Sequence, residues 1–177
     1  MRYLNCEEHI IHVGPLIRRE QIYKNDLMED RKKLFCALFH FTRKLPVSYI
    51  SAKVKKSECA DVVELTTKLT KSISQILRAQ TEYFESFDKI IVYYDNGQVE
   101  LTKILTTLFN TLFNNVEFRK VKPAEYKLFQ VADLICTLEL LHEKAGTSSF
   151  THSELEFFHS VRDFKKLYYK YISQKHI

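Results

Sequence analysis

The spacing of apolar residues predicts that most of this 177-residue chain is helical. Apolar positions recur every three or four residues over about 26–44 and 60–84, and again in two later segments. Such spacing gives a helix one continuous apolar stripe, which packs against a core. Near the end of the chain, Ser153 and Glu156 match the capping box that begins a helix.

Short apolar runs between these helices predict strands at about 47–55, 89–94 and 116–121. The run Ile90–Tyr94 is apolar on both faces, as in a central strand of a covered sheet. Helices between the strands imply parallel pairing through right-handed crossovers. Three strands make a narrow sheet, so we expect either a further strand in residues 1–14 or the loss of strands that once preceded the chain. An open sheet edge would allow the chain to self-associate.

The composition is that of a soluble globular protein, for which we expect a single domain over residues 1–177. Hydrophobic residues make up 45%, and only three Gly and three Pro occur, which favours helix over an all-β fold. No apolar run approaches a membrane span and no signal core begins the chain. We therefore expect a cytoplasmic protein without a membrane partner. The four cysteines lie far apart, which favours reduced thiols over disulfides or a zinc site.

Positive charge gathers near the end of the chain and suggests nucleic acid as a partner. The net charge is +5, and residues 162–177 hold five Lys and Arg against one Asp, with three tyrosines between them. A basic segment with interleaved aromatic residues could follow a phosphate backbone. An ordinary terminal helix explains the same pattern if its tyrosines pack and its lysines stay in water. The sequence leaves both interpretations open.

Two acids stand in positions that suggest a metal site. Asp95 directly follows an apolar strand, where ligands gather in open parallel sheets, and Asp133 lies among apolar residues of a helix. A buried carboxylate needs a partner, and two acids that approach each other can hold Mg²⁺ or Mn²⁺. Such ions would activate water for phosphodiester hydrolysis. Alternatively, Asp95 only caps a helix after a turn, and Asp133 pairs with a Lys or Arg.

Polar residues near these acids extend the candidate site. Gln130 lies one helical turn before the second acid, and Asn96 follows the first in the predicted turn. Lys122 and Lys127 could contact substrate phosphates or only solvate a strand end. No Gly-rich phosphate loop, GxSxG elbow or HExxH motif occurs in the sequence.

Three segments resemble bacterial members of domain-of-unknown-function family 3800. They are residues 12–19, HVGPLIRR; residues 92–98, VYYDNGQ; and residues 118–135, which end in LFQVADLI. The resemblance implies an α/β, RNase H-like three-layer fold, with a mostly parallel sheet, flanking helices and an acidic metal site. It makes Asp95 and Asp133 metal ligands, and it matches His12 to a His of that family. The family's first strand carries an Asp-Glu-Ser-Gly motif that this sequence lacks, so the chain resembles a shortened member without its first strands.

The residues and the resemblance together suggest two functions. The first is a metal-dependent nuclease or another phosphodiester-acting hydrolase, in which Asp95 and Asp133 bind Mg²⁺ or Mn²⁺. The substrate and the metal's water would then be surrounded by His12, Asn96, Gln130, Lys122 and Lys127. Because one acid of the family is missing, the shortened chain could be inactive. The second function is a non-catalytic nucleic-acid- or protein-binding module on the same scaffold.

Overall fold

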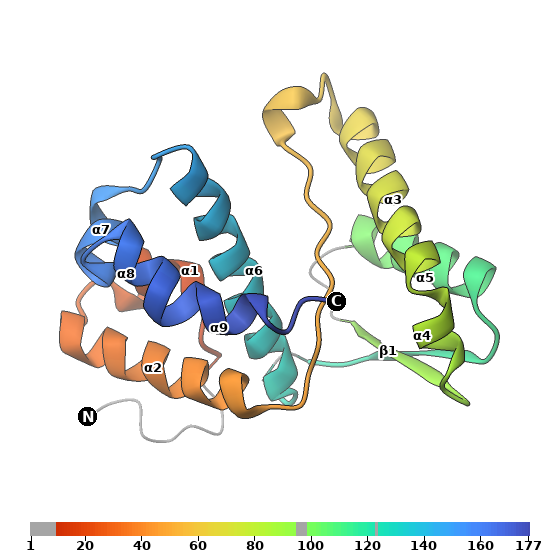
Figure 1. The fold of residues 1–177 in the computed structure, drawn as a ribbon, viewed down its shortest axis with the longest axis horizontal. Helices are drawn as coiled ribbons and strands as arrows, with labels where there is room; N and C mark the ends of the chain where they lie inside the picture. Colours follow the sequence, from red (N-terminus) through yellow and green to blue (C-terminus); the bar gives the residue numbers. More distant parts are fainter. Residues whose placement is uncertain (1–9, 95–98, 123) are drawn as a thin grey trace. The chain divides into compact units, whose positions relative to one another are not determined.

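The computed structural model of the chain describes residues 10–94, 99–122 and 124–177 (Figure 1). By its internal contacts the chain divides into two compact units. Unit 1 comprises Met1–Tyr49 and Pro123–Ile177, and unit 2 is the segment Ile50–Lys122 between them in the sequence. Among the described residues, each unit has a hydrophobic core of its own. The expectation of one domain over the whole chain stays a prediction.

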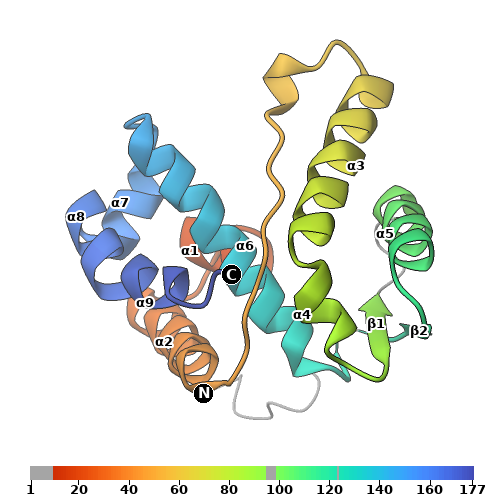
Figure 2. The same cartoon turned by 45° about the vertical axis from the view of Figure 1, so that its right-hand side comes forward.

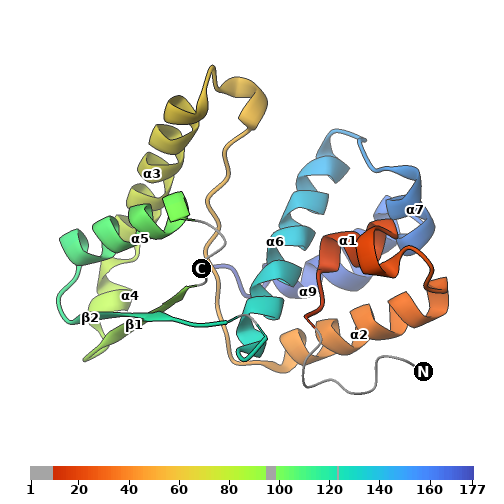
Figure 3. The ribbon, with the colours of Figure 1, turned by 180° about the vertical axis from the view of Figure 1, so that it is seen from behind.

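The regular elements described in unit 1 are all helices. They are α1 (Val13–Arg18), η1 (Gln21–Tyr23), α2 (Met28–Lys44), α6 (Lys127–Gly146), α7 (His152–Phe158), α8 (Val161–Asp163), η3 (Phe164–Tyr169) and α9 (Lys170–Ser173). The last three follow one another without a break, so residues 161–173 form one C-terminal helix with a π-helical middle. Figure 3 shows α1 lying against α6 and α7, with α2 below it.

Apolar packing around α1 and between the long helices forms the core of unit 1. Leu16 of α1 and Leu134 and Leu138 of α6 are completely buried. Aromatic rings join α2 to the C-terminal helix: Tyr168 meets Phe35 and Phe39 edge-on, with ring centroids 5.3 and 5.1 Å apart. These contacts fix α2 and the C-terminal helix side by side (Figure 2).

The end of the chain is tied to the segment that follows α2. The amide of Tyr49 donates to the carbonyl of Lys175 at 2.9 Å, and the amide of Ile177 donates to the carbonyl of Tyr49 at 3.1 Å. The Tyr49 hydroxyl also donates to the buried carboxylate of Glu139 on α6, as does the hydroxyl of Tyr169 at 3.3 Å. Burial, and then the bond to Glu139, raise the pKa of Tyr49, which keeps its phenol protonated as a donor.

Unit 2 combines helices with a small sheet. Its elements are η2 (Lys56–Glu58), α3 (Val62–Ala79), α4 (Thr81–Glu85), β1 (Ile90–Tyr94), α5 (Val99–Leu112) and β2 (Val116–Lys120). The two strands pair in parallel from Ile90 opposite Val116 to Tyr94 opposite Lys120, and α5 makes the crossover between them. Ile73 and Leu77 of α3 and Ile104 and Phe109 of α5 pack with the inward residues of the strands. One face of the sheet is thus covered by helices.

The expected RNase H-like three-layer fold is wrong for the described part of the chain. There the structure is mostly helical, and its one sheet has two strands. Residues 47–55 form no strand, since only Tyr49 makes a bridge, with His176. β1 alternates between half-buried and exposed residues, so it is not a central strand covered on both faces. β-branched residues favour extended backbone, but they do not show whether a partner strand is within reach.

Other local predictions fare better. The helix predicted over 26–44 is α2, and the strands at 89–94 and 116–121 are β1 and β2, with the expected parallel pairing. The helix predicted over 60–84 breaks at Gln80, between α3 and α4. The capping box lies two residues earlier than predicted, at Thr151 and Glu154 of α7. In the described ranges, no helix is both long enough and apolar enough to cross a membrane.

Candidate functional site

Asp133, the acid predicted to bind metal from a helix, is bonded to the start of α1. Its Oδ2 accepts a hydrogen bond from the backbone amide of Val13 at 2.8 Å. Val13 is the first residue of α1, and the N-cap residue His12 gives that helix no side-chain cap. The first amides of a helix lack partners within it and carry partial positive charge. The half-buried carboxylate of Asp133 therefore has a partner that is neither a Lys or Arg nor a metal.

Arg31 of α2 holds the other end of α1. Its Nη1 donates to the carbonyls of Leu16 and Ile17 at 2.9 and 3.0 Å, and only 2% of the residue is exposed. Burial, and then the charge of Arg19, lower the pKa of Arg31. The carbonyls at a helix C-terminus carry partial negative charge, which favours a cation there. A half-buried carboxylate and a buried guanidinium thus hold the two ends of one short helix.

Of the other described site residues, Gln130, His12 and Lys127 belong to unit 1 and Lys122 belongs to unit 2. Gln130 is buried on α6, one turn before Asp133. His12 is exposed, and its backbone amide donates to the hydroxyl of Tyr23 at 3.2 Å. Lys127 is exposed at the first residue of α6, and Lys122 is exposed after β2 in unit 2.

Asp95 and Asn96 lie outside the described residues. Among the residues that the structure does describe, no group of three or more His, Cys, Asp or Glu is placed to hold a metal ion. The Mg²⁺ or Mn²⁺ site at Asp95 and Asp133 therefore stays a prediction.

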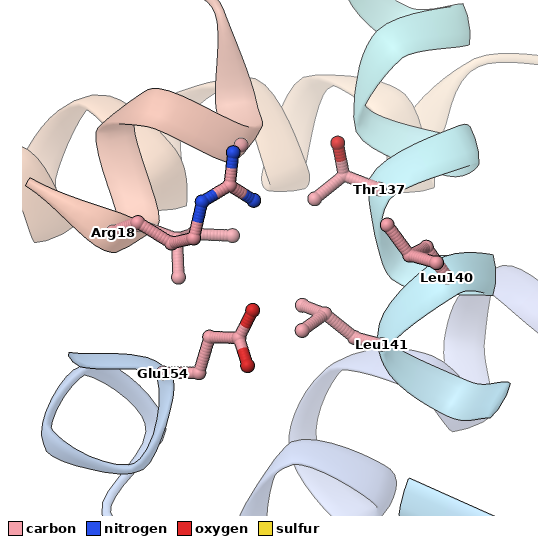
Figure 4. A pocket seen from close by; sticks show the side chains of 7 residues that line it. Arg18, Thr137, Leu140, Leu141 and Glu154 are labelled. Carbon is pink, nitrogen blue, oxygen red and sulfur yellow. The ribbon is translucent and has the colours of Figure 1, made fainter. Parts of the chain in front are cut away.

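A small pocket in unit 1 lies between α1, α6 and α7 (Figure 4). It is lined in part by Arg18, Thr137 and Glu154, and its volume of about 10 Å³ suits one water molecule rather than a substrate. The Glu154 carboxylate is held by Lys144, whose Nζ lies 2.7 and 2.5 Å from its two oxygens, and Arg18 pairs with Glu20. The charged groups that line this pocket therefore pair with other side chains of unit 1.

A larger hollow of about 250 Å³ lies in unit 2, at the end of the sheet where the strands begin. Phe84, Phe87, Ile90 and Phe113 form its apolar walls. None of the residues predicted to form the site lines it. It therefore gives no support to either function suggested by the sequence.

The most strongly charged feature of unit 1 is formed by α2 and the C-terminal helix. Residues 31–48 and 164–177 contain no Asp or Glu. Together they contain nine cations: Arg31, Lys32, Lys33, Arg43, Lys44, Lys165, Lys166, Lys170 and Lys175. Because these two segments pack against each other, their positive charges gather on neighbouring helices.

Some of these cations have structural partners. Arg31 is buried, Lys33 pairs with Asp30, and Lys175 donates to the carbonyl of Leu45 at the end of α2. Lys32 Nζ lies 3.0 Å from Nε2 of His159. The remaining cations are exposed and make no ion pair with a carboxylate in the described ranges: Arg43, Lys44, Lys165, Lys166 and Lys170.

Two exposed side chains of the C-terminal helix, Tyr171 and Leu167, accompany these cations. The guanidinium of Arg43 lies over the ring of Tyr171, 4.6 Å from its centroid, and Phe39 contacts the same ring at 6.5 Å. Tyr171 is 36% exposed, and Leu167, one turn before it, is 49% exposed. We call the surface formed by Arg43, Lys44, Lys165, Lys166, Leu167, Lys170 and Tyr171 the basic face.

The sequence suggested only half of the basic face. The basic tail after residue 161 was evident. Tyr168 and Tyr169 pack while Lys165, Lys166 and Lys170 stay exposed, as an ordinary terminal helix predicts, and nucleic acid as a partner stays a prediction. The contribution of α2 was missed. Its signal was the lack of acids over residues 31–48, but nothing in the sequence placed that segment beside the tail.

No protein-family model, curated protein or solved structure matches this chain. The resemblance to domain-of-unknown-function family 3800 therefore stays a prediction.

Proposed function

We propose that this protein binds nucleic acid and that the basic face of unit 1 holds the phosphate backbone. The observation that carries the proposal is the complete lack of Asp and Glu in the two packed segments that form this face. Five exposed cations without carboxylate partners in the described ranges leave a positive potential over neighbouring helices. Phosphates that replace small counterions at such a surface gain free energy through counterion release.

The exposed side chains between the cations favour nucleic acid over an acidic protein. Tyr171 and Leu167 add exposed apolar surface to the basic face. Every nucleobase has a π-face that can stack on such a surface, next to cations that neutralise its backbone. An acidic peptide would meet the cations but would leave the exposed ring unused.

Catalysis is not part of the proposal. The nuclease hypothesis needs Asp133 to bind metal, and in the structure this carboxylate accepts the Val13 amide at the start of α1. Binding, by contrast, needs only the exposed cations, and these belong to helices held by the core of unit 1.

The test measures the affinity of the full chain for a labelled mixed-sequence oligonucleotide by fluorescence anisotropy, at several salt concentrations. We expect the logarithm of the association constant to fall linearly with the logarithm of the salt concentration. The double variant Lys166→Gln/Lys170→Gln should bind about tenfold more weakly near physiological salt, with a salt slope lower by roughly one or more, because two phosphate contacts are lost.

The matched control is Lys56→Gln/Lys71→Gln, which removes the same charge from exposed positions of unit 2. It should change the affinity less than twofold. Equal losses in the two double variants would mean that net charge alone drives binding, and would overturn the assignment to the basic face. Equally strong competition by polyglutamate would overturn the assignment to nucleic acid.

A further inference from the structure

We infer that the basic face takes single-stranded nucleic acid, whose unpaired bases stack on the ring of Tyr171. This inference rests on the proposed function and adds the class of nucleic acid. Arg43 lies over the Tyr171 ring, Phe39 meets the ring at an interplanar angle of 71°, and 36% of the residue stays exposed.

The contacts of Tyr171 hold its ring in place before any ligand binds. Arg43 reaches the ring from the last turn of α2, and Phe39 reaches it from one turn earlier. A cation over one ring face is attracted by its π electrons. Because the ring is already ordered, stacking a base on it costs little side-chain entropy.

The cations lie where the backbone of a stacked strand would pass. Lys166 and Lys170 are one turn apart on the C-terminal helix and next in sequence to Leu167 and Tyr171. Arg43, whose guanidinium lies over the ring, and Lys44 end α2, the helix that packs against the C-terminal helix. A base on Tyr171 would therefore have cations of two helices nearby, which suits the phosphates before and after it.

A duplex cannot use this arrangement fully. Its bases are stacked inside the double helix, so they cannot stack on Tyr171, and the basic face would meet mainly its phosphates. Single strands expose the faces of their bases, and stacking on an aromatic residue adds affinity without reading sequence. We therefore expect the basic face to prefer single strands over duplexes of the same length.

The experiment compares three labelled 15-nucleotide probes with the full chain: a single strand, the matching duplex and a single strand of abasic sites. Tyr171→Ala should weaken binding of the ordinary single strand about tenfold, the size expected for losing one stacked base. Binding of the duplex and of the abasic strand should change less than twofold. Tyr171→Phe should bind like the wild type, whereas Tyr171→Leu, which keeps apolar bulk in the helix, should bind like Tyr171→Ala.

The control is Tyr83→Ala, which removes an exposed tyrosine of unit 2 and should leave all three affinities unchanged. If Tyr171→Ala lowered the affinity for the abasic strand as much as for the ordinary single strand, the inference would be overturned. Equal affinity of the wild type for single strand and duplex would also overturn it. In both cases the proposed function would survive, provided that the lysine variants still weaken binding. Failure of the wild type to bind any probe would overturn both.

Discussion

Asp133 lies within an apolar helix because it caps a different helix, 120 residues away in sequence. The carboxylate accepts the Val13 amide and faces the positive end of α1, so it stabilises the fold without any metal. The metal hypothesis and the capping contact predict different results for the same substitutions. Asp133→Asn keeps an acceptor oxygen for the amide and removes the charge that a metal would need.

Under the capping interpretation, Asp133→Ala should lower the free energy of unfolding by about 1–2 kcal/mol, and Asp133→Asn by about half of that. Urea titrations followed by circular dichroism would measure both values. Calorimetric titration with Mn²⁺ supplies the second readout, and we expect no difference between the wild type and Asp133→Asn. Loss of Mn²⁺ binding in the folded Asp133→Asn variant would contradict the capping interpretation and support Asp133 as a metal ligand.

Two single residues show which contacts can be predicted from the sequence and which cannot. Asp133 and Arg31 both lie on otherwise apolar helix faces, and this placement alone says that each has a buried partner. The partners are backbone groups of α1, which carry no mark in the sequence. Side-chain chemistry can be anticipated from residue type, but a backbone partner is known only once the chain is folded.

At the scale of elements, the long amphipathic helices were predictable. Apolar residues spaced three and four apart form one continuous face only when the segment is helical. α2 matches its prediction closely, and so do the paired strands β1 and β2. The three-layer fold was wrong because strand number depends on long-range pairing. The segment 47–55 has the composition of a strand, yet the structure pairs only Tyr49 of it, with the chain's own C-terminal segment.

The ion pair that attaches α7 to α6 predicts how the stability of the protein depends on pH. Glu154 of α7 is 1% exposed; it completes the capping box with Thr151 and bonds Lys144 of α6. Burial by itself would raise the pKa of Glu154, but the bonds from Lys144 and the Thr151 amide outweigh it and leave the pKa below its ordinary value of 4.5. A carboxyl group with a lowered folded-state pKa stabilises the protein above its unfolded-state pKa and loses this contribution as the pH falls.

Glu154→Gln keeps the capping box, since Gln also serves at that position, and removes only the charge paired with Lys144. We expect a loss of about 2 kcal/mol in the free energy of unfolding at pH 7, because Lys144 is left with little access to water. The difference from the wild type should shrink progressively below about pH 4.5, as Glu154 becomes protonated. Denaturant titrations between pH 7 and pH 3 would measure this difference in the free energy of unfolding. Glu156→Gln, a substitution at an exposed position, is the control. A difference that does not vary with pH would contradict the role of the charge.

At the scale of the whole molecule, the two described hydrophobic cores share no residue. The core of unit 1 joins residues before Tyr49 to residues after Pro123, whereas the core of unit 2 lies within Ile50–Lys122. Stability that comes from separate cores should be lost in separate steps. The sequence could not show this division, because no Gly/Pro-rich linker or change of composition marks its borders.

Matched substitutions in the two cores test the division. Leu134→Ala in unit 1 and Leu77→Ala in unit 2 remove side chains that are at most 1% exposed, and each should cost about 3 kcal/mol. Differential scanning calorimetry of the wild type should then resolve two transitions, because each unit unfolds with its own core. Each variant should lower the midpoint of one transition by about 10 °C or more and leave the other within about 2 °C. A single transition that both variants lower equally would show instead that the chain unfolds as one domain, as its length and composition predict.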